Sequence, residues 1–212
     1  MLKIEKTEVF GWEAAIRGMR NPLNSWDKSD STLLPVYAQP ADYVPEIGEN
    51  DHDLMMRLAK GGSTHAKYRR MITVTCDITA PLYWWKEFDT YKVGTVANSC
   101  STMHKIHAKE FTLDDFSHDR LDKWHEAFLE AIMRRLNADR VCFLETKDKH
   151  YWDQMIQLLP SSYNQKRTIQ LNYEVLVGMY RDRRNHKLDE WHTLCEWIES
   201  LPYSEIITGG MI

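Results

Sequence analysis

A strand that leads directly into a proline-initiated, aromatic-rich helix constrains this chain more than any other feature. Residues 71–78 (MITVTCDI) place β-branched side chains at a period of two, which predicts a strand. Ala80 and Pro81 follow, and Pro81 fits the first turn of a helix, where its missing N–H costs nothing. The predicted helix extends toward Tyr91, and we expect Gly94 to end it. It carries four large apolar side chains: Leu82, Trp84, Trp85 and Phe88.

The remaining segments are predicted mainly from hydrophobic periodicity. Residues 2–9 alternate as a strand does, and helical spacing is found in six segments: 11–20, 51–60 (capped by Asn50 or Asp51), 117–136, 151–159, 168–183 and 188–201. The clearest helix is 117–136, and its expected inward face holds Leu121, Trp124, Phe128, Ile132, Met133 and Leu136. Residues 27–50 predict a long loop. The fold class that follows is α+β, dominated by helices, with a small antiparallel sheet.

Composition limits the class of protein. The 212 residues suffice for one large domain or two small ones, and we expect a single domain over residues 1–212. A net charge of −4 argues against a dedicated nucleic-acid-binding protein. No apolar run reaches the roughly 18–20 residues of a transmembrane helix. The first residues lack a signal-peptide core, so a cytoplasmic protein without membrane contact is expected. The four cysteines lack zinc-site spacing and are expected to be free thiols, mostly buried.

Two groups of polar residues are candidates for a functional site. His104 and His107 form an HxxH pair, which fits a metal hydrolase or, more simply, two surface histidines, and we predict no metal site. A basic cluster either holds a phosphate or complements the dipole of a helix end. Its members are Arg181, Arg183, Arg184, His186 and Lys187, with Lys166 and Arg167 upstream.

The order of these segments resembles the flavin-dependent thymidylate synthases, the ThyX family, over roughly residues 2–200. Members of that family have a helix ending in Gly-His, a strand, an Ala-Pro, an aromatic helix, an Arg-His-Arg triplet and an Asn-Glu-x-Ser-x-Arg stretch. Here Ala80-Pro81 superpose on the family's Ala-Pro, and Leu159-Pro160 on a family Leu-Pro. The resemblance implies a helix-dominated ThyX-like fold with a small antiparallel sheet.

In that register the resemblance implies cofactor and catalytic positions. His65 falls on the family's flavin-contacting histidine, and Asn172 on an asparagine of the flavin and nucleotide region. Arg183 falls on the arginine that contacts the uracil nucleotide, so it is the expected substrate-binding and polarising residue. Thr90-Tyr91-Lys92 stands in place of Arg-His-Arg, which makes Tyr91 and Lys92 the implied flavin contacts there.

The resemblance also implies substrate contacts, several of them altered. Glu87 replaces a family glutamine, and Asn98 and Ser101 keep two residues of the Asn-Glu-x-Ser-x-Arg stretch. Three further family positions are changed: the early flavin-phosphate serine is Pro22, a second histidine is Met71, and an arginine before Leu-Pro is Ile156. New positive charges that offer compensation stand at Lys67, Arg69 and Arg70.

The implied activity is the reductive methylation of deoxyuridylate, or of a close pyrimidine deoxynucleotide, to thymidylate. The implied cofactors are FAD, NADPH and methylenetetrahydrofolate, and the implied assembly is a homotetramer. In this chemistry the cofactor carries the hydride, and the protein supplies orientation and electrostatics. The alternative is a non-catalytic homologue that keeps the fold as a nucleotide-binding or interaction module.

Overall fold

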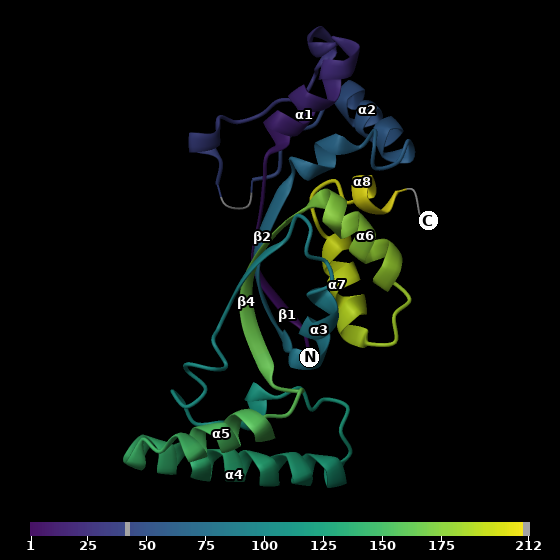
Figure 1. The fold of residues 1–212 in the computed structure, drawn as a ribbon. Coiled ribbons are helices and arrows are strands. Elements are labelled where there is room, and N and C mark those ends of the chain that lie inside the picture. The colour runs from purple at the N-terminus through teal and green to yellow at the C-terminus, as the bar shows by residue number, and fades with distance from the viewer. Residues whose placement is uncertain (41–42, 210–212) are drawn as a thin grey trace. The chain divides into compact units, whose positions relative to one another are not determined.

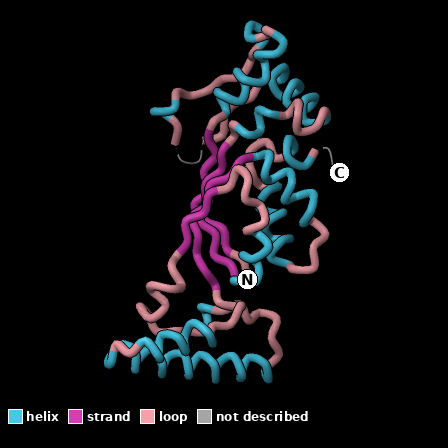
Figure 2. The backbone as a smooth tube through the Cα atoms, viewed as in Figure 1, coloured by secondary structure: helices cyan, strands magenta, loops and turns pink. Residues whose placement is uncertain are grey.

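The computed structural model describes residues 1–40 and 43–209. Within them four strands form one antiparallel sheet in the order β1-β2-β4-β3. Figure 2 shows these strands in magenta. The strands are β1 (Lys3–Phe10), β2 (Thr73–Pro81), β3 (Val96–Ser99) and β4 (Asn164–Asn172). Together with a helix content of about half the chain, the sheet confirms the α+β class predicted from the sequence.

The helices follow the order of the predicted segments (Figure 1). Those before strand β3 are α1 (Trp12–Arg20), α2 (Glu49–Lys60) and α3 (Leu82–Phe88). Those after it are α4 (Lys123–Thr146), α5 (Lys149–Leu158), α6 (Tyr173–Arg183), α7 (Asp189–Glu199) and α8 (Glu205–Thr208). Among the described residues, no helix is both long and apolar enough to cross a bilayer.

Two of the predicted helix boundaries are wrong. Residues Thr168 to Asn172 were expected to be helical, but they complete strand β4, with Ile169 and Leu171 buried on alternate positions. Pairing with neighbouring strands overrides the helical spacing that continues from α6. Pro81 closes β2 and serves as the N-cap of α3, which ends at Phe88, well before Gly94.

The inward face predicted for the helix at 117–136 is also wrong in part. Helix α4 begins at Lys123, after Asp122 has capped it by accepting a hydrogen bond from the backbone N–H of His125. Leu136 is buried as expected, whereas Leu121 is 41%, Trp124 71% and Phe128 57% exposed. Leu129, which the expected face did not include, is buried as well. Both faces of α4 carry apolar residues, so periodicity alone could not identify the buried one.

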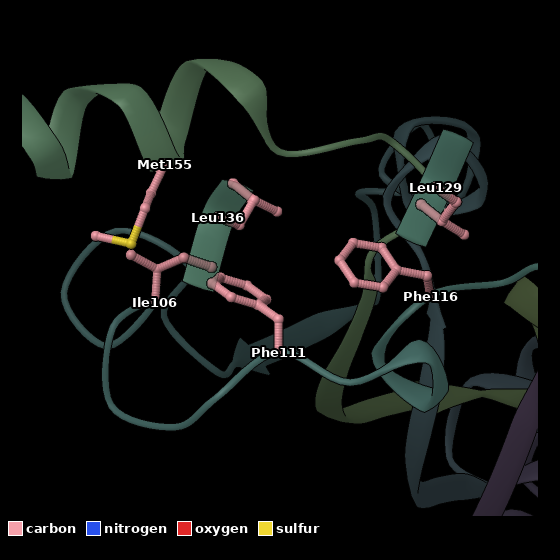
Figure 3. Packing of buried hydrophobic residues seen from close by; sticks show 6 residues of the cluster. All are labelled: Ile106, Phe111, Phe116, Leu129, Leu136 and Met155. Atoms are coloured by element: carbon pink, nitrogen blue, oxygen red, sulfur yellow. The ribbon is translucent and has the colours of Figure 1, made fainter. Parts of the chain in front are cut away.

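The chain divides into two compact units, and a single domain over residues 1–212 stays a prediction. The first unit comprises Met1–Lys3, Ile78–Thr90 and Asn98–Arg167. Its hydrophobic cluster joins α4 and α5 to the loop before them (Figure 3). The buried members are Ile106, Phe111, Phe116, Leu129, Leu136 and Met155.

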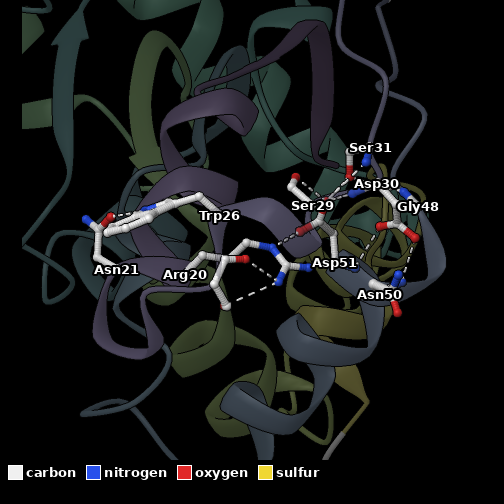
Figure 4. Close-up of polar contacts among 10 residues, drawn as sticks. Arg20, Asn21, Trp26, Ser29, Asp30, Ser31, Gly48, Asn50 and Asp51 are labelled. Atoms are coloured by element: carbon white, nitrogen blue, oxygen red, sulfur yellow. Dashed lines mark hydrogen bonds and ion pairs between the residues drawn. The ribbon is translucent and has the colours of Figure 1, made fainter.

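The second unit comprises Ile4–Asp77, Tyr91–Ala97 and Thr168–Ile212. A buried ion pair connects α1 to α2 in it, with Arg20 Nε 2.6 Å from Asp51 Oδ1 (Figure 4). The expected cap at Asn50 or Asp51 is wrong, because Gly48 is the N-cap residue. The carboxylate of Asp30 instead accepts hydrogen bonds from the backbone N–H groups of Asn50 and Asp51.

The predicted loop at 27–50 contains short elements of its own. The 3-10 turns Trp26–Lys28 and Val36–Ala38 and a bridge between Thr32 and Glu46 interrupt it. Its last residues already belong to α2. Residues 41 and 42 of this stretch lie outside the described residues.

The cysteines are free thiols, as predicted. Cys76 and Cys195 are buried, Cys142 is half-buried and Cys100 is exposed. The expected burial is therefore confirmed for Cys76 and Cys195 and is wrong for Cys100. Burial raises the pKa of Cys76 to about 12 and that of Cys195 to about 11, with Asp77 and Glu199 acting in the same direction. These two thiols are therefore neutral packing groups near neutral pH.

Candidate functional site

Arg183 lies in the last turn of α6, in the second unit, between two aromatic rings. Its Nε donates a 2.9 Å hydrogen bond to the hydroxyl of Tyr91. Its guanidinium carbon is 4.6 Å from the ring centre of Trp191, on α7, and 5.5 Å from that of Tyr91. Cation–π contact of this kind fixes a guanidinium while leaving its charge intact. The structure thus brings together Tyr91 and Arg183, two residues that sequence reasoning selected separately.

Trp191 is the member of this group that sequence reasoning missed as a site residue. It belongs to the inward face of α7 and is fully buried, so its pattern in the sequence is that of a core residue. Its ring centre is 6.1 Å from that of Tyr91. No local motif connects α6, α7 and the segment after α3, and only the tertiary structure shows that they converge.

Asn172 has a structural role at the start of α6. Its side-chain Oδ1 accepts a 3.1 Å hydrogen bond from the backbone N–H of Val175 and caps the helix. Gly94 packs against it, because a Cβ on Gly94 would lie 3.0 Å from Asn172 Nδ2. The neighbouring Thr95 has a buried hydroxyl without a hydrogen-bond partner among the described residues.

His65 lies elsewhere in the second unit, in the turn between α2 and the 3-10 turn Lys67–Arg70. It is exposed and lines a cavity of about 530 Å³. The other lining residues come from α1, the turn after it, α2 and the residues before β2: Gly18, Met19, Asn21, Pro22, Leu23, Leu58, Thr64, Lys67, Tyr68 and Met71. Pro22 and Met71, two of the positions at which this chain departs from the ThyX pattern, therefore line the same cavity as His65.

The cavity of His65 has mixed chemistry. Met19, Leu23, Leu58 and Met71 supply apolar walls, and the ammonium of Lys67 and the hydroxyl of Thr64 supply polar groups. This set fits an aromatic ring with an anionic group beside it. Arg69, another expected compensating charge, does not line this cavity, and its Nη1 is 3.6 Å from the carboxylate of Glu174.

The remaining predicted positions are divided between the units. Lys92 is exposed in the second unit, next to Tyr91. Glu87, Asn98 and Ser101 belong to the first unit. Glu87 is half-buried in α3, and Asn98 is exposed in β3. Ser101 Oγ accepts a 2.8 Å hydrogen bond from the backbone N–H of His104.

Ser101 lines a second cavity, of about 490 Å³, within the first unit. Three lysines and two aspartates also line it: Lys105, Lys109, Lys166, Asp114 and Asp115. Lys109 forms an ion pair with Asp115. Lys105, Lys166 and Asp114 are the other charged residues of the lining. The exposed thiol of Cys100 also lines this cavity, and its backbone carbonyl accepts a hydrogen bond from Gln165 Nε2 at 2.7 Å.

The other chemical groups proposed from the sequence are dispersed. Among residues 1–40 and 43–209, no three potential metal ligands gather, and the ring of His107 packs on Phe143 with centroids 4.8 Å apart. The guanidinium of Arg167, in the first unit, lies 4.1 Å from the ring centre of Trp85 and pairs with Asp89 at 2.7 Å. Arg181 pairs with its neighbour Asp182 at 2.8 Å.

Two crystal structures of flavin-dependent thymidylate synthase ThyX from Helicobacter pylori with FAD and dUMP are similar to this chain. Their TM-scores are 0.68 and 0.69, each at 15% sequence identity. The alignments cover 96% and 97% of this chain and 96% of each crystallised chain. No protein-family model matches the sequence, and no curated protein matches it either. The chain therefore has the α+β fold of the ThyX flavin-dependent thymidylate synthases.

Proposed function

We propose that this chain is a flavin-dependent thymidylate synthase-like enzyme, which methylates deoxyuridylate or a closely related pyrimidine deoxynucleotide. The observation that carries the proposal is the cavity beside α1 and α2. His65, Pro22 and Met71 come from three separate segments, and each falls on a family position for flavin contact or its neighbourhood. Their convergence on one cavity supports a flavin site there, in a fold shared with proteins crystallised with FAD and dUMP.

The donors of that cavity fit a flavin nucleotide. His65 and Thr64 offer hydrogen bonds, and Lys67 offers a positive charge to a phosphate. Lys92, Tyr91 and the Nδ2 of Asn172 are the further proposed cofactor contacts. When bound, FAD supplies the hydride, NADPH restores it, and methylenetetrahydrofolate provides the one-carbon unit.

Arg183 is the proposed catalytic residue. The guanidinium of Arg183 offers its positive charge and a planar set of N–H donors to the pyrimidine nucleotide. Tyr91 and Trp191 hold it in one orientation, which spares the cost of ordering a flexible side chain on binding. A charge that is already oriented stabilises the charge that develops on a substrate without a cost of reorganisation.

The proposed substrate contacts of the first unit are Glu87, Asn98 and Ser101. Ser101 is supported by its place in the 490 Å³ cavity beside Lys105 and Lys166. The family arginine of this stretch is replaced by Met103, and we propose that these two lysines provide the positive charge in its place. A homotetramer in the cytoplasm completes the proposal, as the resemblance implies.

A second candidate is a non-catalytic homologue that binds nucleotide without flavin. It is favoured by the contacts of Thr90, which stands where the family has the first arginine of its triplet. The Thr90 hydroxyl donates a 2.7 Å hydrogen bond to the carbonyl of Glu87 and closes the end of α3. Lys92 stands where the family has the second arginine of the triplet, so two guanidinium groups are missing at a site that faces phosphates in the family. Each charge-assisted hydrogen bond is worth roughly 1.5–3 kcal/mol.

Flavin titration separates the two candidates. The purified chain is titrated with FAD while flavin fluorescence is followed, in parallel with the Helicobacter pylori enzyme as the reference. We expect saturable binding that is weaker than that of the reference, followed by NADPH oxidation that depends on deoxyuridylate and methylenetetrahydrofolate. Nucleotide binding without any flavin binding would identify the non-catalytic homologue, and absence of both would contradict both candidates.

A further inference from the structure

The direction of one hydrogen bond determines where the proton of the Tyr91 hydroxyl lies. Arg183 Nε carries one hydrogen and has no lone pair to offer, so in the 2.9 Å contact the guanidinium donates and the Tyr91 oxygen accepts. A phenol also has a proton of its own to donate. That proton has to point away from Arg183, which leaves the hydroxyl as a donor with a defined direction.

The donated proton of Tyr91 has no acceptor in the part of the chain that the structure describes. Among residues 1–40 and 43–209, the Tyr91 oxygen takes part in no hydrogen bond besides the one from Arg183. The side chain is half-buried, in the segment between α3 and β3. Accepting a hydrogen bond from a cation polarises the O–H bond and makes the phenol a stronger donor. The hydroxyl is therefore suited to an acceptor on a ligand.

Aromatic packing holds both members of this pair in place. The Tyr91 ring meets the ring of Trp191 at an interplanar angle of 62°, with centroids 6.1 Å apart. The guanidinium carbon of Arg183 is 4.6 Å from the ring centre of Trp191, which is itself fully buried. The donor is thus oriented before a ligand arrives, which spares the cost of ordering it on binding.

The proposed reaction indicates which acceptor this donor fits. Conversion of deoxyuridylate to thymidylate adds a methyl group at C5 of uracil, and the C4 carbonyl is bonded directly to that carbon. Electron density that moves through the ring during reaction at C5 collects on the C4 oxygen, where a positioned donor stabilises it. The same position distinguishes the pyrimidines, because uracil presents a carbonyl acceptor at C4 and cytosine an amino donor.

Given the proposed function, we propose that the Tyr91 hydroxyl donates a hydrogen bond to the C4 carbonyl oxygen of the pyrimidine and so selects uracil over cytosine. A cytosine amino group in that place meets a second donor. The phenol cannot reverse its direction, because turning its proton toward Arg183 sets two donors against each other. A hydrogen bond of fixed direction discriminates strongly between such analogues.

The first test is calorimetric titration of the full-length chain with deoxyuridylate and with deoxycytidylate. We expect the wild type to prefer deoxyuridylate by roughly tenfold or more. In Tyr91→Phe the affinity for deoxyuridylate should fall while that for deoxycytidylate stays the same, so the preference disappears. Tyr180→Phe is the matched control, because it removes another tyrosine hydroxyl of the same unit, which donates a 2.7 Å hydrogen bond to Glu199. It should keep the preference.

A role of Tyr91 in holding Arg183 alone gives a different result. Tyr91→Phe then lowers the affinity for both nucleotides by the same factor, and the proposal is wrong. A contact of the hydroxyl with the phosphate also weakens both nucleotides equally, but it leaves the binding of deoxyuridine, which has no phosphate, unchanged. That result also overturns the proposal. A thermal melt of Tyr91→Phe checks that the variant is folded.

A modified base tests the same contact without changing the protein. In 4-thiodeoxyuridylate a sulfur atom, which is a weaker acceptor, replaces the C4 oxygen. We expect it to bind the wild type several-fold more weakly than deoxyuridylate, and to bind Tyr91→Phe as well as deoxyuridylate does. The isomer 2-thiodeoxyuridylate is the control, and its affinity relative to deoxyuridylate should be the same in both proteins. Sensitivity of Tyr91 to the C2 position in place of C4 would overturn the assignment.

The Tyr91 contact and the proposed enzyme can fail separately. A preference for uracil that Tyr91→Phe abolishes, in a chain that binds no flavin, would support the contact and contradict the flavin-dependent enzyme. Flavin-dependent turnover with a preference that Tyr91→Phe leaves unchanged would support the enzyme and overturn the contact. A wild type that binds neither nucleotide would overturn both.

Discussion

Arg183 Nε and the hydroxyl of Tyr91 are joined by a hydrogen bond of 2.9 Å, although 92 positions separate the two residues in the chain. Tyr91 is a proposed cofactor contact, and Arg183 is the proposed contact to the nucleotide. The hydrogen bond therefore connects the proposed cofactor and substrate contacts of the second unit directly.

Removing that hydrogen bond should weaken nucleotide binding. Tyr91→Phe keeps the ring but frees Arg183 Nε, and we expect deoxyuridylate affinity to fall roughly tenfold, equivalent to about 1.4 kcal/mol. Arg183→Ala should abolish binding, whereas Arg184→Ala, one position farther around the helix, should have little effect. Isothermal titration calorimetry measures all three. Equal small losses for Arg183→Ala and Arg184→Ala would indicate a diffuse charge effect and no defined site.

The cavity beside α1 and α2 makes a prediction about His65. Because its side chain is exposed, His65→Ala should leave the thermal midpoint almost unchanged while FAD affinity falls severalfold. His150→Ala is a suitable control, since His150 is an exposed histidine in the other unit. The measurements are a thermal melt and a FAD fluorescence titration. A large loss of midpoint with unchanged FAD affinity would show that His65 has a structural role only.

The buried ion pair of Arg20 and Asp51 should be important for stability. Asp51→Asn leaves the guanidinium of Arg20 without its charged partner, and we expect the free energy of unfolding to fall by about 3–5 kcal/mol. Glu13→Gln removes the partner of Arg17 in an exposed pair and should cost at most about 1 kcal/mol. Chemical denaturation of the two variants gives the comparison. Equal losses would mean that burial of the pair has no particular effect.

The ion pair of Arg20 and Asp51 also predicts how the free energy of unfolding depends on pH. Burial opposes ionisation of Asp51, but hydrogen bonds from Ser31, Ser29 and Arg20 outweigh it and lower its pKa in the folded protein. The stabilisation is therefore complete above the unfolded pKa of about 3.9 and is lost as pH falls through the lower folded value. Asp51→Asn should flatten this acid limb of the stability curve. An identical acid limb in both proteins would exclude Asp51 as its cause.

Two glycines should respond to alanine with opposite signs. Gly94 has a φ of 77°, and a Cβ there would lie 3.0 Å from Asn172 Nδ2 and 3.1 Å from Val175 Cγ2. Gly94→Ala should therefore destabilise the fold by about 1–2 kcal/mol. Gly178 is inside α6, and a Cβ added there would meet no atom within 4 Å, so Gly178→Ala should stabilise by roughly 0.5–1 kcal/mol. Thermal denaturation shows whether each variant is more or less stable than the wild type. A stabilising effect of Gly94→Ala would contradict the strain expected from a Cβ at this position.

The sequence by itself determined most of the local structure and the fold class. Alternating β-branched residues predicted β2, and helical spacing predicted α1, α5 and α7. These features depend on interactions within a few residues of chain, which is why periodicity and capping identify them. The resemblance in segment order likewise predicted the fold that the Helicobacter pylori structures share.

Only the tertiary structure decided which surfaces are buried and which side chains meet. Thr168 to Asn172 form a strand because neighbouring strands pair with them, and Trp124 is exposed because α5 covers the other face of α4. Trp191 contacts Arg183, and Pro22 lines the cavity of His65, through contacts between segments far apart in the sequence. Such contacts depend on packing between elements, and the periodicity of a single segment carries no information about its partners.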